Sequence, residues 1–230
     1  MKWLAFATDF DGTIATDGMV DEGTIAALQR VKAGGLTTLL VTGRELKDFD
    51  HAPEVLTMFD CVVAENGGVL YSPQTKEVRV IAAPPPQAFV DDLTRRGIPL
   101  SVGHVIIATV EPHEIEVLEV IKEMALEFQV IFNKGAVMVL PAGVNKASGL
   151  QAALESYGIS LSEVVAVGDA ENDNAFLEHC GCAVAVANAL PALKERVNYV
   201  TRSNAGAGVM ELIDSLLRGG LDPGKKGAIL

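Results

Sequence analysis

Near its start the chain carries the apolar run Trp3-Leu4-Ala5-Phe6-Ala7-Thr8, followed directly by Asp9-Phe10-Asp11-Gly12-Thr13. A short apolar run that ends in carboxylates is typical of a buried strand that delivers polar groups at its carboxyl end. The run is too short for a signal-peptide core or a membrane span. We therefore interpret residues 3–8 as a buried strand and residues 9–18 as a polar loop.

The residues that follow predict a crossover unit. Ile25, Leu28 and Val31 recur at helical spacing, which predicts a helix over 21–33 that Gly34-Gly35 ends. Two further apolar runs, 36–41 and 61–64, read as strands. Strand, helix and strand in this order indicate parallel strands joined by a right-handed crossover.

The same alternation of predicted strands and helices occurs in the last third of the chain. The predicted elements there are a helix over 146–157, a strand over 164–167, a helix over 173–179, a strand over 182–187 and a helix over 208–217. The fold class is therefore α/β: a Rossmann-like, doubly wound, mostly parallel sheet with helices on both faces.

The middle of the chain has a different sequence pattern. Ala83-Pro84-Pro85-Pro86 is a stiff break and marks a boundary. Beyond it the patterns predict a small α+β insert: a helix over 87–96, a strand over 104–110, a helix over 112–126 and a hairpin of 129–132 with 136–140 across Asn133-Lys134-Gly135. We expect a core made of 1–82 and 142–218, a cap over 83–141 and a flexible tail over 219–230.

Composition excludes several classes of protein. Hydrophobic residues make up 49% of the 230 residues, enough for a substantial core. The formal net charge of −12 disfavours a nucleic-acid partner, because an acidic surface repels phosphate backbones. The three cysteines do not form an even disulfide framework and fit a reducing, cytoplasmic location. His179-Cys180-Gly181-Cys182 lacks a second ligand pair and is read as core rather than a zinc site.

Polar side chains follow several predicted parallel strands at their carboxyl ends. Asp9 and Asp11 follow the first strand, Thr42 the second, and Asp169 and Asp173 the strand over 164–167. In open α/β sheets these ends meet at one crevice, where ligands bind. Four carboxylates there require protons or a cation, and hard oxygen ligands favour Mg²⁺.

These residue types suit phosphoryl transfer. Asp9 can act as a nucleophile and form an aspartyl-phosphate, and Asp11 can act as acid and then base on the leaving group and the attacking water. Thr42, Gly43 and Lys146 can surround the phosphate with a hydroxyl, a backbone N–H and a positive charge.

The motifs resemble those of haloacid dehalogenase superfamily phosphatases, in the Cof-type branch with a cap between the second and third motifs. The four motifs that carry this resemblance are, in order, Asp9-Phe10-Asp11-Gly12-Thr13, Val41-Thr42-Gly43-Arg44, Asn145-Lys146 and Gly168-Asp169-Ala170-Glu171-Asn172-Asp173. Glu65-Asn66-Gly67-Gly68 and the position of the insert resemble the capped branch. The resemblance implies Asp9 as nucleophile and Mg²⁺ ligand, Asp11 as a ligand through its carbonyl, Asp169 as third protein ligand and Asp173 in support. Relatives often carry Gly-Asn-Ala where this chain has Ala187-Asn188-Ala189.

Other polar residues are candidate substrate contacts or supports of the metal ligands. They are Arg44, Glu65, Asn66, Asn172, Asn188 and Lys134, with His104, Arg95 and Arg96 as weaker candidates in the cap. For the cap residues, a solvated surface side chain without a functional role is favoured over a substrate contact. Gly219 to Lys226 has the spacing of a phosphate loop but lacks its Ser/Thr and its preceding strand, so we reject it.

The predicted function is magnesium-dependent hydrolysis of a small phosphorylated metabolite, a sugar phosphate or a phosphoglycolate-like acid, with neither nucleic acid nor membrane as partner. One alternative is a sugar phosphomutase that uses the same phospho-aspartate. The other is a non-catalytic, phospho-responsive binding module, against which the predicted acid/base Asp11 argues. The sequence sets no oligomeric state.

Overall fold

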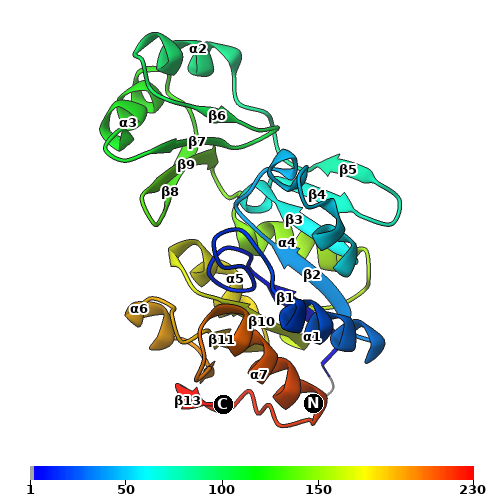
Figure 1. The fold of residues 1–230 in the computed structure, drawn as a ribbon. Helices are drawn as coiled ribbons and strands as arrows, with labels where there is room; N and C mark the ends of the chain where they lie inside the picture. Colours follow the sequence, from blue (N-terminus) through cyan, green and yellow to red (C-terminus); the bar gives the residue numbers. More distant parts are fainter. Residues whose placement is uncertain (1–2) are drawn as a thin grey trace.

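A computed structural model describes residues 3–230, and within them nine strands form one large sheet (Figure 1). The strand order is β13-β12-β11-β10-β1-β2-β3-β4-β5, and all neighbours are parallel except the β3–β4 and β4–β5 pairs. The strands are β1 (Ala5–Thr8), β2 (Thr37–Val41), β3 (Cys61–Ala64), β4 (Val69–Ser72), β5 (Glu77–Val80), β10 (Val164–Gly168), β11 (Cys182–Ala185), β12 (Tyr199–Val200) and β13 (Ala228–Ile229). The predicted α/β class is confirmed.

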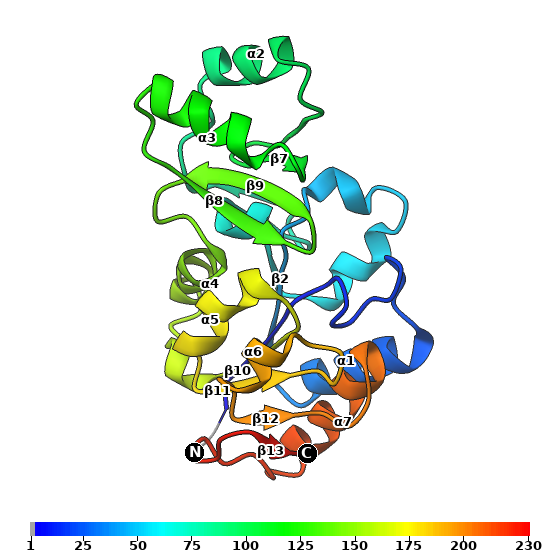
Figure 2. The same ribbon diagram turned by 90° about the vertical axis from the view of Figure 1, so that its left-hand side faces the viewer.

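Helices cover both faces of this sheet. In Figure 2, α1 (Glu22–Ala33) and α7 (Ala205–Leu217) lie on one face, and α4 (Lys146–Glu155) and α5 (Asn174–His179) on the other. The short α6 (Pro191–Lys194) follows β11. Strands β1 and β10 are adjacent at the centre, and the chain winds outward from them in opposite directions, which creates a switch point at their carboxyl ends.

The sequence explains why these helices begin and end where they do. Asp21 caps α1 by accepting a hydrogen bond from the Thr24 backbone N–H at 3.0 Å, and the helix ends at Gly34. Asn145 caps α4 in the same way, accepting from Ala147 and Ser148. This cap fixes Lys146 as the first residue of α4.

The insert forms a second, four-stranded antiparallel sheet in the order β6-β7-β9-β8. Its helices, α2 (Gln87–Arg95) and α3 (Glu114–Glu123), lie on the side of this sheet remote from the large sheet (Figures 1 and 2). They pack an apolar cluster of their own that includes Phe89, Leu93, Val117 and Val120. The strands of this smaller sheet are β6 (Ser101–Val102), β7 (Ile107–Val110), β8 (Phe128–Asn133) and β9 (Ala136–Pro141).

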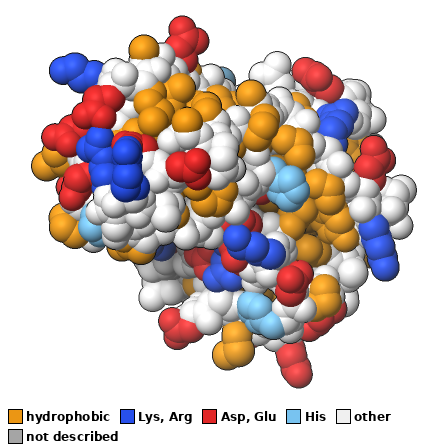
Figure 3. Space-filling model, turned by 90° about the horizontal axis from the view of Figure 1, so that it is seen from above, with side chains coloured by type: hydrophobic (Ala, Val, Ile, Leu, Met, Phe, Trp, Pro, Cys, Tyr) orange, Lys and Arg blue, Asp and Glu red, His pale blue; other side chains and the backbone are white. Residues whose placement is uncertain are grey.

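The other face of the insert packs on the main body. Val105, Ile106, Met138 and Leu140 are buried within the same apolar cluster as the strands of the large sheet. Seen from the insert's end of the molecule, lysine and arginine side chains are interspersed with aspartate and glutamate rather than gathered in one basic patch (Figure 3). Within residues 3–230, none of the helices is long and apolar enough to cross a membrane.

Several elements differ from their sequence-based prediction. The hairpin of β4 and β5 was not predicted, because all four residues of β5 are exposed and the strand pairs only with β4, at the edge of the large sheet. The predicted strand over 104–110 begins only at Ile107, since residues 104–106 donate hydrogen bonds to Glu65 instead of a strand.

The tail expected to be flexible, 219–230, adds β13 to the edge of the large sheet. The Gly227 N–H donates to Val197 at 3.0 Å, and Leu221 is buried.

Candidate active site

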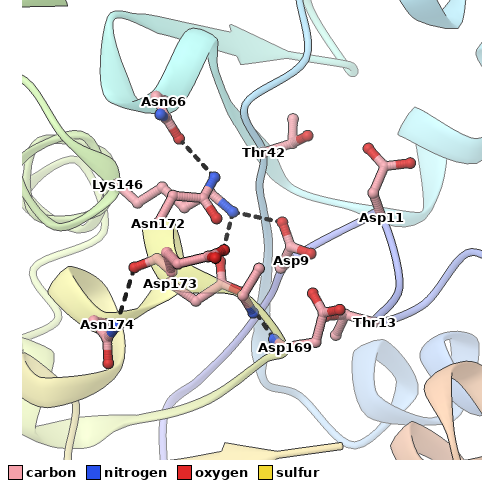
Figure 4. Close-up of polar contacts among 12 residues, drawn as sticks. Asp9, Asp11, Thr13, Thr42, Asn66, Lys146, Asp169, Asn172, Asp173 and Asn174 are labelled. Carbon is pink, nitrogen blue, oxygen red and sulfur yellow. Dashed lines mark hydrogen bonds and ion pairs between the residues drawn. The ribbon is translucent and has the colours of Figure 1, made fainter. Parts of the chain in front are cut away.

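Three carboxylates gather at the switch point of the large sheet (Figure 4). Asp9 follows β1, and Asp169 and Asp173 follow β10. One oxygen from each carboxylate lies within 4.8 Å of the others, and all three residues are buried. Parallel strand ends thus bring together acids that are 160 residues or more apart in the chain, from Asp9 to Asp169.

Lys146 lies between two of these acids. Its Nζ donates to Asp9 Oδ1 at 2.5 Å and to Asp173 Oδ1 at 2.6 Å, and the residue is only 1% exposed. The second oxygen of Asp173 accepts from the backbone N–H groups of Asp169 at 2.8 Å and Ala170 at 2.9 Å. Asp173 therefore holds both the lysine and the turn that carries Asp169.

The electrostatics of this cluster are unbalanced. Three buried carboxylates face one buried ammonium, which leaves two negative charges uncompensated by buried groups. Burial and the neighbouring charge of Asp173 raise the pKa of Asp9 to about 7, against the lowering effect of Lys146. Burial also raises the pKa of Asp169. Burial is the main cause of both pKa shifts, and the neighbouring carboxylate of Asp173 adds to each.

The donor set fits a hard divalent cation. Mg²⁺ prefers a few carboxylate and carbonyl oxygens together with water, and it carries the charge that the cluster lacks. Asp9, Asp169 and Asp173 offer such oxygens. The Asp11 carbonyl oxygen lies close to them, since the Lys134 ammonium contacts both this oxygen and Asp169. These residues could hold Mg²⁺.

The carboxylate of Asp11 does not join the cluster. It forms a bidentate pair with Arg44, with Nε to Oδ2 at 2.8 Å and Nη2 to Oδ1 at 2.7 Å. The guanidinium also stacks on Phe10 and Phe49. In Figure 4 the Asp11 side chain points away from Asp169 and Asp173. The prediction of four carboxylates at one point is therefore wrong for Asp11, because two aromatic rings place a better partner beside it.

Thr42 and Gly43 lie at the end of β2, beside the cluster. The buried Thr42 hydroxyl accepts a hydrogen bond from the Arg44 N–H at 3.1 Å. A Cβ at Gly43 would lie 3.6 Å from Asn66 Oδ1 and Asn172 Nδ2, so the glycine backbone faces these two amides. Asn172 donates to Asn66 at 3.1 Å, and its own buried Oδ1 has no partner within residues 3–230.

Glu65 links the main body to the insert. Its carboxylate is fully buried and accepts from three successive backbone N–H groups of the insert, those of His104, Val105 and Ile106, at 2.7–3.0 Å. The His104 ring nitrogen Nδ1 lies 3.1 Å from the same carboxylate. Through these contacts Glu65 and His104 hold the insert against the sheet.

We expect Glu65→Gln to loosen this link. The amide keeps the size of the side chain but replaces one accepting oxygen by a donor, which leaves at least one of the three N–H groups unpaired. The free energy of unfolding should fall by about 1–3 kcal/mol. Amide hydrogen exchange at residues 104–106 should accelerate, whereas Glu155→Gln, at an exposed position on α4, should change neither quantity. Unchanged exchange in Glu65→Gln would contradict this account.

The remaining candidates divide into those near the cluster and those remote from it. Lys134, at the tip of the β8–β9 hairpin, reaches Asp169 Oδ2 at 2.5 Å. Asn188 donates to the Gly12 carbonyl at 2.7 Å and accepts from the Ala205 N–H, so it ties the loop that follows β1 to the start of α7. Arg95 and Arg96 lie on the remote face of the insert, where both pair with Asp92 and Arg96 also pairs with Glu119 and Glu123.

Sequence reasoning missed Thr13, to which it assigned no role. The Thr13 hydroxyl donates to Asp169 Oδ1 at 3.3 Å, so the last residue of the first motif supports an acid from the fourth. The only sequence evidence for a role of Thr13 was its position within the first motif. The His179–Cys182 segment is packed rather than clustered around a site: Cys182 is buried in β11, and the His179 ring contacts the Ala175 carbonyl.

A doubly wound sheet with buried carboxylates and a buried lysine at its carboxyl edge, below a small inserted sheet, defines a class of phosphoryl-transfer hydrolases. A profile for the haloacid dehalogenase-like hydrolases matches residues 6–94 and 101–213. A phosphoglycolate phosphatase of Methanothermobacter thermautotrophicus is 35% identical, over 91% of this chain and 96% of that protein. The chain belongs to the haloacid dehalogenase-like hydrolase family, and the predicted class of enzyme, a phosphatase, is confirmed.

Solved structures share the fold. A sugar phosphatase of haloacid dehalogenase subclass IIB superposes with a TM-score of 0.76 at 20% identity, over 95% of this chain and 100% of that one. A Bacteroides thetaiotaomicron protein from a study of phosphatases in this superfamily gives a TM-score of 0.78 at 21% identity, over 96% of each chain. The predicted resemblance to the capped branch is confirmed at the level of the fold.

The raised pKa of Asp9 predicts a pH-dependent stability. The pKa of about 7 in the folded, metal-free protein lies above the ordinary value of 3.8, so folding retains a proton that the unfolded chain releases. This stabilising contribution is complete below pH 3.8 and is lost as the pH rises through about 7. We expect Asp9→Asn, which cannot titrate, to gain stability relative to the unsubstituted protein between pH 5 and pH 8 in EDTA. A difference in urea midpoint that stays constant with pH would contradict the shift.

Proposed function

We propose that the chain is a magnesium-dependent phosphomonoester hydrolase that forms an aspartyl-phosphate on Asp9. The observation that carries the proposal is the position of Asp9, at the carboxyl end of the central strand and hydrogen-bonded to a buried lysine. A carboxylate in this position can attack phosphorus, and Lys146 can offset the negative charge of the approaching phosphate. Bound Mg²⁺, held by Asp9, Asp169 and the Asp11 carbonyl with support from Asp173, would neutralise charge on the phosphoryl oxygens.

Asp11 is the proposed acid and base. Its side chain is 44% exposed and faces the solvent-accessible side of the loop, where a leaving group can approach. Since Arg44 holds both of its oxygens, Asp11 must exchange the guanidinium for the leaving oxygen when substrate binds. The Thr42 hydroxyl and the Gly43 N–H are the proposed donors to the phosphate, with Asn66 and Asn172 positioning this loop.

The proposed substrate is a small phosphorylated acid of the phosphoglycolate type. Two curated relatives at 35% and 32% identity are phosphoglycolate phosphatases, and each aligns with more than 90% of this chain. A cavity of about 470 Å³ lies beside the catalytic loop and suits a compact ligand. Its lining includes Asp11, Gly12, Lys134 and Asn188.

The insert is the proposed cap. We place the catalytic core at residues 1–82 and 142–218 and the cap at 83–141. Met138 of the insert lies against the Asn66 amide, 3.5 Å away, so apolar cap residues stand close to the site and can exclude water during phosphoryl transfer. The unpaired thiols of Cys61, Cys180 and Cys182 fit the proposed reducing, cytoplasmic location.

A phosphate-release screen tests the function. With Mg²⁺, we expect phosphoglycolate to give the highest kcat/KM of a panel that also contains hexose and pentose phosphates, and EDTA to abolish release. Preference for a hexose phosphate would overturn the substrate class while leaving the chemistry. Isomerised product that requires a bisphosphorylated primer would indicate a mutase, and no release from any compound would indicate a binding module.

A further inference from the structure

The tip of the β8–β9 hairpin carries Lys134 in a tight turn. Lys134 and Gly135 form the two-residue turn between Asn133 and Ala136, with φ of 48° and 84°. Two positive φ values are typical of the tight turn that matches the twist of a hairpin. Residues Phe128–Asn133 pair with Ala136–Pro141 across this hairpin, so the turn presents Lys134 at the end of a regular two-stranded arm.

The Lys134 ammonium contacts oxygens of the proposed metal site. Its Nζ lies 2.5 Å from Asp169 Oδ2 and 3.5 Å from the Asp11 carbonyl oxygen. A Cβ built on Gly12 would lie 2.7 Å from the same Nζ, so the ammonium lies against the backbone of Gly12 in the loop that follows β1. These contacts come from the cap, whereas the contacts of Lys146 come from within the core.

The two lysines therefore play different parts. Lys146 is buried, is fixed by the capped start of α4 and binds Asp9 and Asp173. The Lys134 side chain is 48% exposed and binds Asp169, whose own side chain is only 1% exposed. An ammonium on an arm can withdraw into water at little cost, while a buried one cannot.

We propose that Lys134 is a tethered cation that competes with the divalent metal for Asp169 and the Asp11 carbonyl, so that metal binding releases the tip of the cap hairpin. The inference rests on the proposed function, because it takes these oxygens as metal ligands. An ammonium and a divalent ion that share two oxygens repel each other at contact distance, so each is bound best when the other has left. Metal binding and hairpin docking are then coupled negatively, and by the same factor in both directions.

Metal affinity measured without substrate tests the competition. Lys134→Met keeps the length of the side chain and removes its charge. We expect it to bind Mg²⁺ about tenfold more tightly than the unsubstituted protein in calorimetric titrations at low ionic strength, the result if the hairpin is docked about nine-tenths of the time. Lys76→Met is the matched control, since Lys76 also has a positive φ in a hairpin turn, and it should leave the affinity unchanged.

A second measurement follows Lys134 itself. Acylation by an amine-reactive reagent, quantified by mass spectrometry, should modify Lys134 several times faster in Mg²⁺ than in EDTA, because metal binding frees the amine. The rate at Lys76 should not change. Equal or slower modification of Lys134 in Mg²⁺ would overturn the proposal.

The outcomes separate this inference from the proposed function. Equal or weaker Mg²⁺ binding by Lys134→Met, with an increased KM for phosphoglycolate, would make Lys134 a substrate contact and overturn the competition while leaving the phosphatase intact. If neither protein bound Mg²⁺, the metal site of the proposed function would fail together with the inference. Tighter binding in Lys134→Met without phosphate release from any substrate would support the competition and reject the proposed function.

Discussion

Asp9→Asn is expected to lower phosphate release by at least about 10³-fold, because an amide cannot act as the nucleophile that forms the acyl-phosphate. The substitution is nearly isosteric, and Asp9 is only 5% exposed, so the side chain should stay in place. The uncharged amide also removes one of three like charges from the cluster. We therefore expect a folded protein with unchanged far-ultraviolet circular dichroism and a urea midpoint at pH 7.5 no lower than that of the unsubstituted chain.

The matched control is Asp91→Asn, on the exposed surface of α2 in the insert. It should retain full activity, which would show that loss in Asp9→Asn does not follow from any Asp-to-Asn change. Incubation with labelled substrate and rapid acid quenching should trap label on the unsubstituted protein and not on Asp9→Asn. Residual activity above about a tenth in Asp9→Asn would rule out Asp9 as the nucleophile.

Lys146→Met should cost both activity and stability. Removing the ammonium leaves Asp9 and Asp173 as buried carboxylates without their shared partner, and breaking a buried ion pair in this way costs about 3–5 kcal/mol of folding free energy. Activity should fall by at least about 10²-fold, since the loss removes a fixed positive charge from the phosphate site. Chemical denaturation in EDTA and steady-state phosphate release measure the two effects.

Two features of Lys146→Met distinguish this cause from a simple packing defect. The loss of stability should shrink on acidification toward pH 5, because a protonated Asp9 no longer needs the ammonium. It should also shrink when Mg²⁺ is added, because a divalent ion supplies charge to the same acids. Lys122→Met, at an exposed position on α3, should alter neither stability nor activity. A pH-independent loss that Mg²⁺ does not reduce would refute the electrostatic explanation.

The fold could be predicted because its signals are local. Short apolar runs that end in polar residues placed β1, β2, β3 and β10 within two residues of their observed bounds. Parallel strand ends then required Asp9 and Asp169 to lie close together, although they are far apart in the sequence. The β4–β5 hairpin and β13 were not predicted, since their pairing depends on the edges of a sheet that exists only after folding.

The site was predicted less completely than the fold. Asp11 and Arg44 both stood in recognised motifs, but their mutual pairing depends on side-chain rotamers and on the rings of Phe10 and Phe49. The hairpin that carries Lys134 was predicted, while its contact with Asp169 depends on how the insert is oriented. Glu65 sets that orientation through three backbone N–H groups, and backbone donors leave no trace in the sequence.

The separate apolar cluster of the insert has a consequence for how this protein can diversify. Phe89, Leu93, Val117 and Val120 pack on the side of the small sheet remote from the large sheet, whereas Met138 contacts Asn66 and Lys134, at the hairpin tip, contacts Asp169. Substitutions at the exposed tip of the β8–β9 hairpin can therefore accumulate without disturbing the cluster that holds the insert together. The hairpin tip can thus vary in sequence while a separate apolar cluster preserves the fold of the insert.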